Sequence, residues 1–154
     1  PTDPPLAPHI TGRDGRTLAQ AWSPSMRAYA STTVSGFPNL FIVPGPNAGI
    51  GHTSLIYMIE SQLSHVVSAL QYMTAAGVSA MEPRAAAQAN YAAAIDERMR
   101  GTVWTAGGCQ SWYIDASGRN SVLWPDFTFR FRQQVARVNP HHYLLTHSSP
   151  PTAT

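Results

Sequence analysis

The chain has 154 residues, which suits one domain, and its 12% of charged residues is a low fraction for a protein surface. Such a surface is expected to be covered, whether by a partner, a second subunit or the rest of a larger protein. Ten scattered arginines and no lysine disfavour nucleic-acid binding, and no apolar run reaches the roughly 18 residues of a membrane span.

The chain opens with a proline-rich stretch, residues 1–15, that has the composition of a surface loop from inside a larger fold. Residues 17–22 can form one or two helical turns. Further on, the short apolar run Leu40–Val43 is typical of a buried strand, and it leads directly into the turn Pro44-Gly45-Pro46.

A long helix is predicted from about residue 54 to residue 76, because apolar residues recur there at spacings of three and four. Thr53 or Ser54 can cap its start, and Gly77 can close its end in a left-handed conformation. The apolar positions form a single stripe, which in a globular protein normally faces the core: Ile56, Ile59, Leu63, Val66, Leu70 and Met73.

A second helix is indicated by Pro83 in its first turn and by an alanine-rich run to about Arg100, which Gly101 ends. Its core face is expected to consist of Tyr91, Ile95 and Met99. The segments "CQSWYID" and "SVLW" then flank "ASGRN", a pattern typical of a β-hairpin with Gly118 in the turn.

The last predicted element, residues 126–138, fits two periods. Phenylalanines at 127, 129 and 131 alternate with polar residues as in a strand, whereas positions 127, 131, 135 and 138 share one face of a helix. Asp126 as a cap and the run "RQQVARV" favour the helix. Residues 146–154 are expected to be a disordered tail.

The turn between the predicted strand and the long helix is the strongest candidate for a binding site. Its residues 49–54, "GIGHTS", are a near miss of the dinucleotide fingerprint, with serine where the third glycine belongs. A glycine-rich turn that feeds a helix directs free backbone amides and the positive end of the helix dipole towards one crevice. The glycines and prolines could equally serve only to shape a tight loop, and the residues alone favour neither alternative.

Other chemistry has weaker support. The histidines at 141, 142 and 147 lack a carboxylate or cysteine partner, so we interpret them as surface residues and not as metal ligands. Cys109, the single cysteine, excludes an internal disulfide, fits a cytoplasmic protein, and is expected to be a small buried residue because no base lies near it in sequence. Glu60 is expected to be a solvated or salt-bridged side chain on its helix.

Three segments resemble one family. Residues 36–62, "GFPNLFIVPGPNAGIGHTSLIYMIESQ", closely resemble a segment near the end of the FAD domain of class B flavoprotein monooxygenases of the Baeyer–Villiger type. Residues 2–22 look like the loop after the family's Ala-Thr-Gly motif, and residues 107–132, "GGCQSWYIDASGRNSVLWPDFTFRFR", are similar to the C-terminal segment of one branch. The resemblance extends over about residues 3–143.

The resemblance implies an α/β fold: an incomplete remnant of a Rossmann-like FAD domain with short strands and the long helix 54–76, followed by the second helix, the hairpin and a C-terminal helix. It divides the chain into a piece of the FAD domain, residues 1–78, a helix and hairpin region, residues 79–145, and the tail.

The resemblance also implies a flavin enzyme that uses FAD, NADPH and O2 to convert a ketone or aldehyde to an ester or lactone, or to oxygenate sulfur. In the family, the start of the long helix faces the pyrimidine edge of the flavin. Residues 53–55 are expected to touch the flavin through their backbone. Trp112 matches a tryptophan that helps to order the nicotinamide cofactor, although it could instead be a core aromatic. The implied cofactor-binding residues are Gly45, Pro46, Asn47, His52, Thr53, Ser54, Leu55 and Trp112.

The resemblance also identifies what these residues lack. The two GxGxxG fingerprints, the fingerprint between them and the active-site arginine are absent, so no catalytic residue is expected here. We expect the chain to need the N-terminal remainder of such an enzyme as a partner, and to be inactive alone. The alternative is a stand-alone, non-catalytic protein-interaction module or an inactive truncated product.

Overall fold

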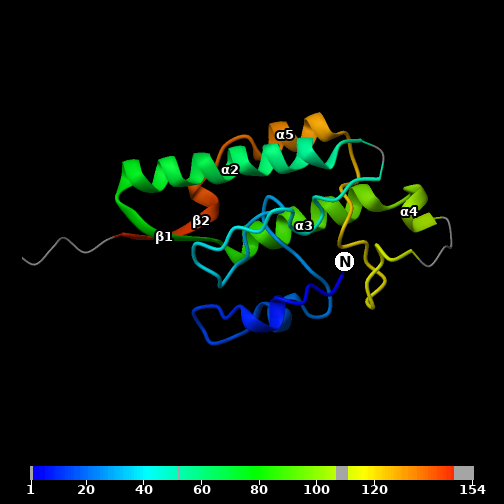
Figure 1. Cartoon of the computed structure of the whole chain (residues 1–154), viewed down its shortest axis with the longest axis horizontal. Coiled ribbons are helices and arrows are strands. Elements are labelled where there is room, and N and C mark those ends of the chain that lie inside the picture. Colours follow the sequence, from blue (N-terminus) through cyan, green and yellow to red (C-terminus); the bar gives the residue numbers. More distant parts are fainter. Residues whose placement is uncertain (1, 52, 107–110, 148–154) are drawn as a thin grey trace, which may run out of the picture.

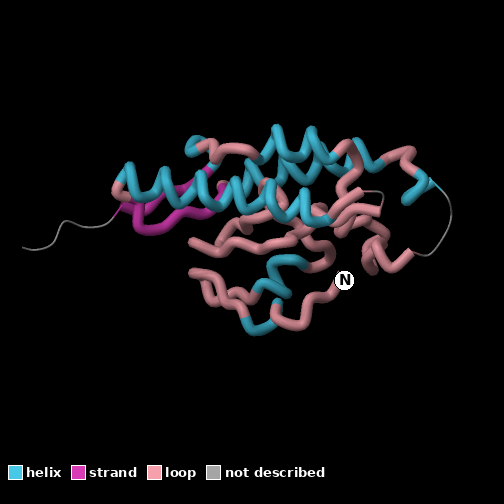
Figure 2. The backbone as a smooth tube through the Cα atoms, turned by 45° about the horizontal axis from the view of Figure 1, so that its top comes forward, coloured by secondary structure: helices cyan, strands magenta, loops and turns pink. Residues whose placement is uncertain are grey.

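The structure is a computed structural model that describes residues 2–51, 53–106 and 111–147. Figure 1 shows α2 running across one side of the molecule with α5 beside it, β1 and β2 near the far end of α2, and α3 beneath; Figure 2 shows the loops gathered on the opposite side from α2. The elements are η1 (Ala7–His9), α1 (Leu18–Trp22), α2 (Leu55–Ala76), β1 (Val78–Pro83), α3 (Ala85–Met99), α4 (Val103–Ala106), α5 (Thr128–Val135), η2 (Pro140–His142) and β2 (Tyr143–His147).

The helices lie close to where the periodicity predicts them. Thr17 caps α1 in a full capping box with Gln20, and Gly77 ends α2 with a φ of 64°. The ambiguous segment forms the helix α5, as favoured, because Phe131 and Val135 are both buried on one face. Together with the small sheet this gives the expected α/β fold. No helix formed by the described residues is long and apolar enough to cross a membrane.

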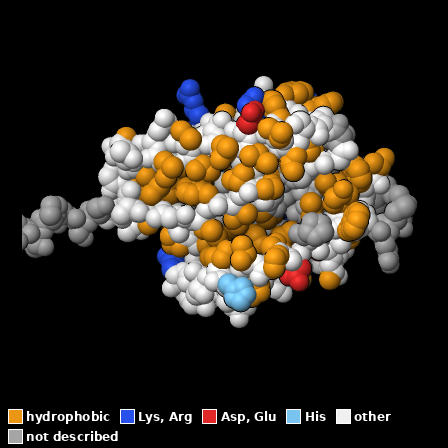
Figure 3. Space-filling view, viewed as in Figure 1, with side chains coloured by type: hydrophobic (Ala, Val, Ile, Leu, Met, Phe, Trp, Pro, Cys, Tyr) orange, Lys and Arg blue, Asp and Glu red, His pale blue; other side chains and the backbone are white. Residues whose placement is uncertain are grey.

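The predicted inner face of α2 is wrong. The side chains that α2 buries are Met58, Ser61, Gln62, His65 and Ala69. Members of the predicted stripe instead lie half-buried or exposed, and Figure 3 shows hydrophobic side chains across the surface over α2. The physical reason is that the buried side of α2 uses polar side chains to satisfy loop backbone groups that have no sheet to bond with.

Gln62 is the centre of that polar contact. Its Nε2 lies 2.6 Å from the carbonyl oxygen of Ser31 and 3.3 Å from that of Ile42. The predicted strand Leu40–Val43 is therefore absent: Phe41 makes one isolated bridge to Thr33, and the carbonyl of Ile42 bonds to a side chain instead of a neighbouring strand.

The sequence periodicity did not predict the two-stranded sheet that the described residues form. β1 and β2 pair antiparallel from Val78 opposite His147 to Pro83 opposite Tyr143, with an irregularity between Val78 and Ala80. That irregularity interrupts the alternation that marks a strand in sequence. Residues 146 and 147, expected in the tail, lie in β2; residues 148–154 are outside the described residues.

The predicted hairpin is reduced to its turn. Gly118 adopts a φ of 82° as expected, and Ile114 and Asn120 form an antiparallel bridge. Residues 121–124 do not continue a strand; instead Leu123 makes a parallel bridge to Gly49, which ties this segment to the glycine-rich loop. The core face of α3 is confirmed, since Tyr91, Ile95 and Met99 are all buried.

A histidine is buried in the core between α2, α5 and β2. His65 Nδ1 lies 2.9 Å from the carbonyl oxygen of Val135, and its Nε2 lies 3.0 Å from the hydroxyl of Tyr143. In the neutral ring, Nδ1–H donates to the carbonyl and Nε2 accepts from the hydroxyl. Burial lowers the pKa of His65 below its usual 6.5, with the hydrogen bond to Val135 acting in the opposite direction.

We expect the free energy of unfolding to fall as the pH drops below about 6.5, because the unfolded chain then binds a proton that the folded state resists. The slope should approach about 1.4 kcal/mol per pH unit until the lowered folded pKa is reached. Urea unfolding at pH values from 8 to 5 measures how the free energy of unfolding depends on pH. In His65→Gln this component of the slope should vanish, whereas the exposed His9→Gln should keep it; equal slopes in all three proteins would contradict the assignment.

Candidate functional site

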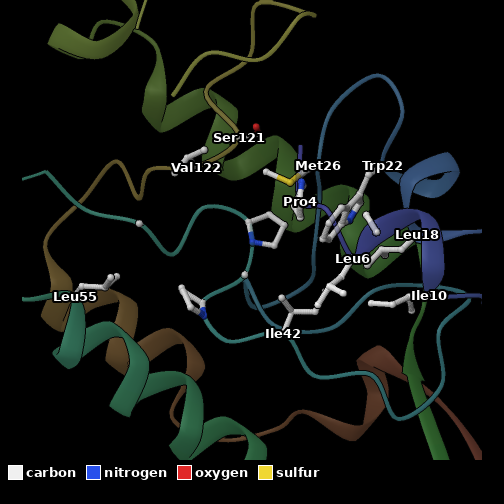
Figure 4. A pocket seen from close by; sticks show the side chains of 15 residues that line it. Pro4, Leu6, Ile10, Leu18, Trp22, Met26, Ile42, Leu55, Ser121 and Val122 are labelled. Carbon is white, nitrogen blue, oxygen red and sulfur yellow. The ribbon is translucent and has the colours of Figure 1, made fainter. Parts of the chain in front are cut away.

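An apolar cleft of about 380 Å³ lies beside the start of α2. Four stretches of chain meet around it: the N-terminal segment up to Met26, the loop from Ile42 to Gly49, the first residue of α2, and residues 121–122 (Figure 4). Its lining is mostly hydrophobic and consists of Pro4, Leu6, Ala7, Ile10, Leu18, Trp22, Met26, Ile42, Pro44, Gly45, Pro46, Gly49, Leu55, Ser121 and Val122. A cleft lined mainly by apolar side chains suits a largely apolar part of a ligand.

The loop on one side of the cleft is held by Asn47. Its backbone is left-handed, with a φ of 58°, and its side chain is buried. The side-chain Nδ2 donates to the carbonyl oxygens of Asn120 and Leu123, each at 2.9 Å. Because the amide group is used inside the chain, Asn47 shapes the cleft and does not face into it.

Glycines allow the same loop to pack closely. A Cβ atom on Gly45 would lie 2.1 Å from the carbonyl oxygen of Ser31, and one on Gly49 would lie 2.9 Å from that of Val122. Both of these glycines also line the cleft. The two alternatives for this turn are therefore not exclusive, because the tight loop forms one wall of a cavity.

The start of α2 lies at the edge of the cleft. Ser54 occupies the N-cap position without a side-chain hydrogen bond to the helix, and Leu55 lines the cleft. Thr53, Ser54 and Leu55 are all exposed. A helix of 22 residues carries a partial positive charge at this end, where its first amides have no intrahelical partner. The terminus is thus open to an electron-rich group.

Comparison with known proteins decides the family. The chain is 45% identical over 150 residues to a Baeyer–Villiger monooxygenase from Streptomyces coelicolor. The aligned residues make up 97% of this chain and 29% of that relative. It is also 45% identical over 138 residues to a Baeyer–Villiger monooxygenase from Pseudomonas aeruginosa. Here the aligned residues make up 89% of this chain and 26% of the relative. A closed crystal structure of cyclohexanone monooxygenase matches with a TM-score of 0.77 at 28% identity, over 90% of this chain and 27% of that one. No family model matches the chain.

The chain matches the C-terminal portion of Baeyer–Villiger monooxygenases. It spans less than a third of the length of these relatives. One fungal relative is named an FAD-binding monooxygenase, and a solved cyclohexanone monooxygenase is bound to NADP+. FAD and NADPH are accordingly the cofactors of the full-length family.

The structure brings only some of the predicted site residues of this monooxygenase segment together. Gly45, Pro46 and Leu55 line the cleft, and Thr53 and Ser54 are exposed just before α2. Asn47 is turned inward, as described above. His52 lies outside the described residues.

Trp112 lies apart from the cleft in this arrangement. Its side chain is 79% exposed and it is not one of the lining residues, so the alternative of a core aromatic is wrong. The neighbouring Tyr113 packs edge-on against Trp104, with ring centroids 5.8 Å apart. The nicotinamide role of Trp112 stays a prediction.

Sequence reasoning missed Arg119, which joins three parts of the monooxygenase segment. Its guanidinium donates to Asp96 on α3 at 2.6 Å, to the carbonyl oxygen of Met26 at 2.7 Å, and to Oδ1 of Asn47 at 2.8 Å. The side chain is only 11% exposed. Its position in "ASGRN" gave no signal beyond a turn, because each of its partners is distant in sequence.

Ser121 is the second residue that was missed. Its Oγ is buried and has no hydrogen-bond partner among the described residues, and the residue lines the cleft. A buried hydroxyl without a partner is unfavourable unless a ligand or water bonds to it.

The weaker candidates gain no support. The described residues contain no group of three histidine, cysteine or acidic side chains that could hold a metal ion. Glu60 lies 3.6 Å from Arg132 in an exposed ion pair, as expected for a solvated side chain. Cys109 lies outside the described residues.

Proposed function

We propose that this chain forms the wall at the pyrimidine edge of the flavin in an FAD- and NADPH-dependent monooxygenase that inserts oxygen into a ketone or aldehyde, or oxygenates sulfur. The observation that carries the proposal is the apolar cleft that has the open N-terminus of α2 at its edge. Its family membership makes FAD the first candidate occupant.

The described residues fit that group. Bound FAD supplies the redox chemistry with NADPH and O2. The amides at 53–55 would stabilise negative charge on the ring edge, with about 0.3–1 kcal/mol from the helix dipole before direct hydrogen bonds are counted. The apolar lining would exclude water from the ring.

Trp112 has a separate proposed role. Its ring is 79% exposed on the segment that follows residues 107–110. A large exposed aromatic gains stability when it is covered, so contact with the nicotinamide cofactor of the whole enzyme would bury it. Substrate choice between a carbonyl compound and a sulfide would depend on residues outside this chain as well.

The test is a chimera in which residues 1–154 replace the matching segment of the Streptomyces coelicolor relative. We expect the purified chimera to be yellow, with close to one FAD per chain, and to consume NADPH faster when a ketone or sulfide is added. The isolated chain should be colourless, because its sequence lacks both GxGxxG fingerprints by which such enzymes hold their cofactors. A soluble, folded chimera without flavin, or an isolated chain with stoichiometric flavin, would contradict the proposal.

A further inference from the structure

A row of apolar side chains lies on the outer surface of α2. Ile56 is 67% exposed, Leu63 49%, Val67 52% and Leu70 49%. Their spacing of seven, four and three places them on one face of the helix. We call these four residues the outer stripe.

The outer stripe borders a groove. The groove has a volume of about 640 Å³ and lies between α2 and the residues that follow α5, with Leu63, Val67 and Ala136 among its lining. Ser64, Ser68 and Arg137 provide polar groups at the same place. An apolar surface with polar groups beside it is typical of a site that packs against another polypeptide.

The two faces of α2 have an unusual distribution of residues. The face towards this chain buries Ser61, Gln62 and His65 as well as Met58 and Ala69, whereas the opposite face exposes the four aliphatic side chains of the outer stripe. A helix with this distribution buries its apolar residues only when a second polypeptide surface packs against its outer face. Leu55, which precedes Ile56 in the first turn of α2, is exposed and lines the cleft, so the outer stripe begins one residue away from the candidate flavin site.

We propose that the outer stripe is the docking face for the polypeptide that makes up the rest of a Baeyer–Villiger monooxygenase. The relatives from Streptomyces and Pseudomonas carry more than two thirds of their length beyond the matched segment, which is ample to cover α2. Because the stripe begins next to Leu55, the same polypeptide would also come close to one side of the cleft. The inference rests on the proposed role of this segment within a larger enzyme, but it does not require flavin to be bound.

The experiment compares two exposed surfaces in the chimera after its flavin is removed. One variant carries Leu63→Gln and Val67→Gln on the outer stripe. The matched control carries Ala93→Gln and Ala94→Gln, two exposed apolar positions on α3. Leu63 and Val67 are half-buried within this chain, so the same two variants are also compared in the isolated chain, and the difference that appears only in the chimera reports the covering polypeptide.

We expect the stripe variant to lower the melting temperature by about 5 °C or more, or to abolish soluble expression, and the control to stay within about 2 °C of the parent. Equal effects of the two variants would overturn the proposal. A second copy of the chain could cover the stripe instead; a chimera that is a dimer by light scattering, and that the stripe variant dissociates, would overturn it as well. Melting without flavin reports docking alone, while FAD content reports the proposed function, so either can fail without the other.

Discussion

Replacing Gly45 with alanine should lower the free energy of unfolding by about 3–5 kcal/mol. The added Cβ would lie 2.1 Å from the carbonyl oxygen of Ser31, a backbone atom that cannot move aside as a side chain can. That same carbonyl accepts a hydrogen bond from Gln62 at 2.6 Å, so any shift also disturbs the contact between the loop and α2. Urea unfolding followed by tryptophan fluorescence measures the loss.

Gly77→Ala is the matched control. Gly77 has a φ of 64° but no heavy atom within 4 Å of an added Cβ, so the change adds only backbone strain, about 1–2 kcal/mol. If the two variants lose the same stability, close packing at Gly45 is not what holds the loop, and the cleft wall is less rigid than described.

The second large effect is expected for Arg119→Met, which should cost about 2–4 kcal/mol of unfolding free energy. Methionine keeps an apolar stem of similar length but leaves Asp96, the carbonyl of Met26 and Oδ1 of Asn47 without their donor. The loss should appear in urea unfolding. In the chimera, FAD affinity should fall too, because Asn47 holds the loop that lines the cleft.

Arg100→Met removes an arginine from an ion pair in which both side chains are mostly exposed, the one with Glu97. Exposed pairs contribute little, so the change should stay within about 0.5 kcal/mol. A loss for Arg119→Met no larger than that would show that the three contacts do not act as a clamp between the parts of the site.

The helices could be predicted from sequence because their signals are local. The period of three and four residues, the left-handed Gly77 and the alanine-rich run of α3 each depend on neighbours within one or two turns. The β1–β2 pair could not be predicted in this way, because its paired residues are 60 to 69 positions apart in sequence. The inner face of α2 was wrong for a related reason: the polar partners of Gln62 and His65 lie in distant loops and strands.

The candidate site shows the same division. The motif placed Gly45, Pro46 and Leu55 near one another, because a turn that leads into a helix is visible in a short window, and all three line the cleft. It could not show that Asn47 points inward, because the carbonyls that fix it belong to residues 73 and 76 positions later. Arg119 and Ser121 could not be predicted either, because the residues around them are distant in sequence. Both belong to the segment that packs against the glycine-rich loop.

The decisive measurement is a crystal structure of the chimera with FAD bound. We expect the isoalloxazine to lie in the cleft of Figure 4, with an amide nitrogen of residues 53–55 within about 3.2 Å of an oxygen or nitrogen on its pyrimidine edge. A flavin bound elsewhere in the chimera, with the cleft filled by protein side chains, would contradict the assignment.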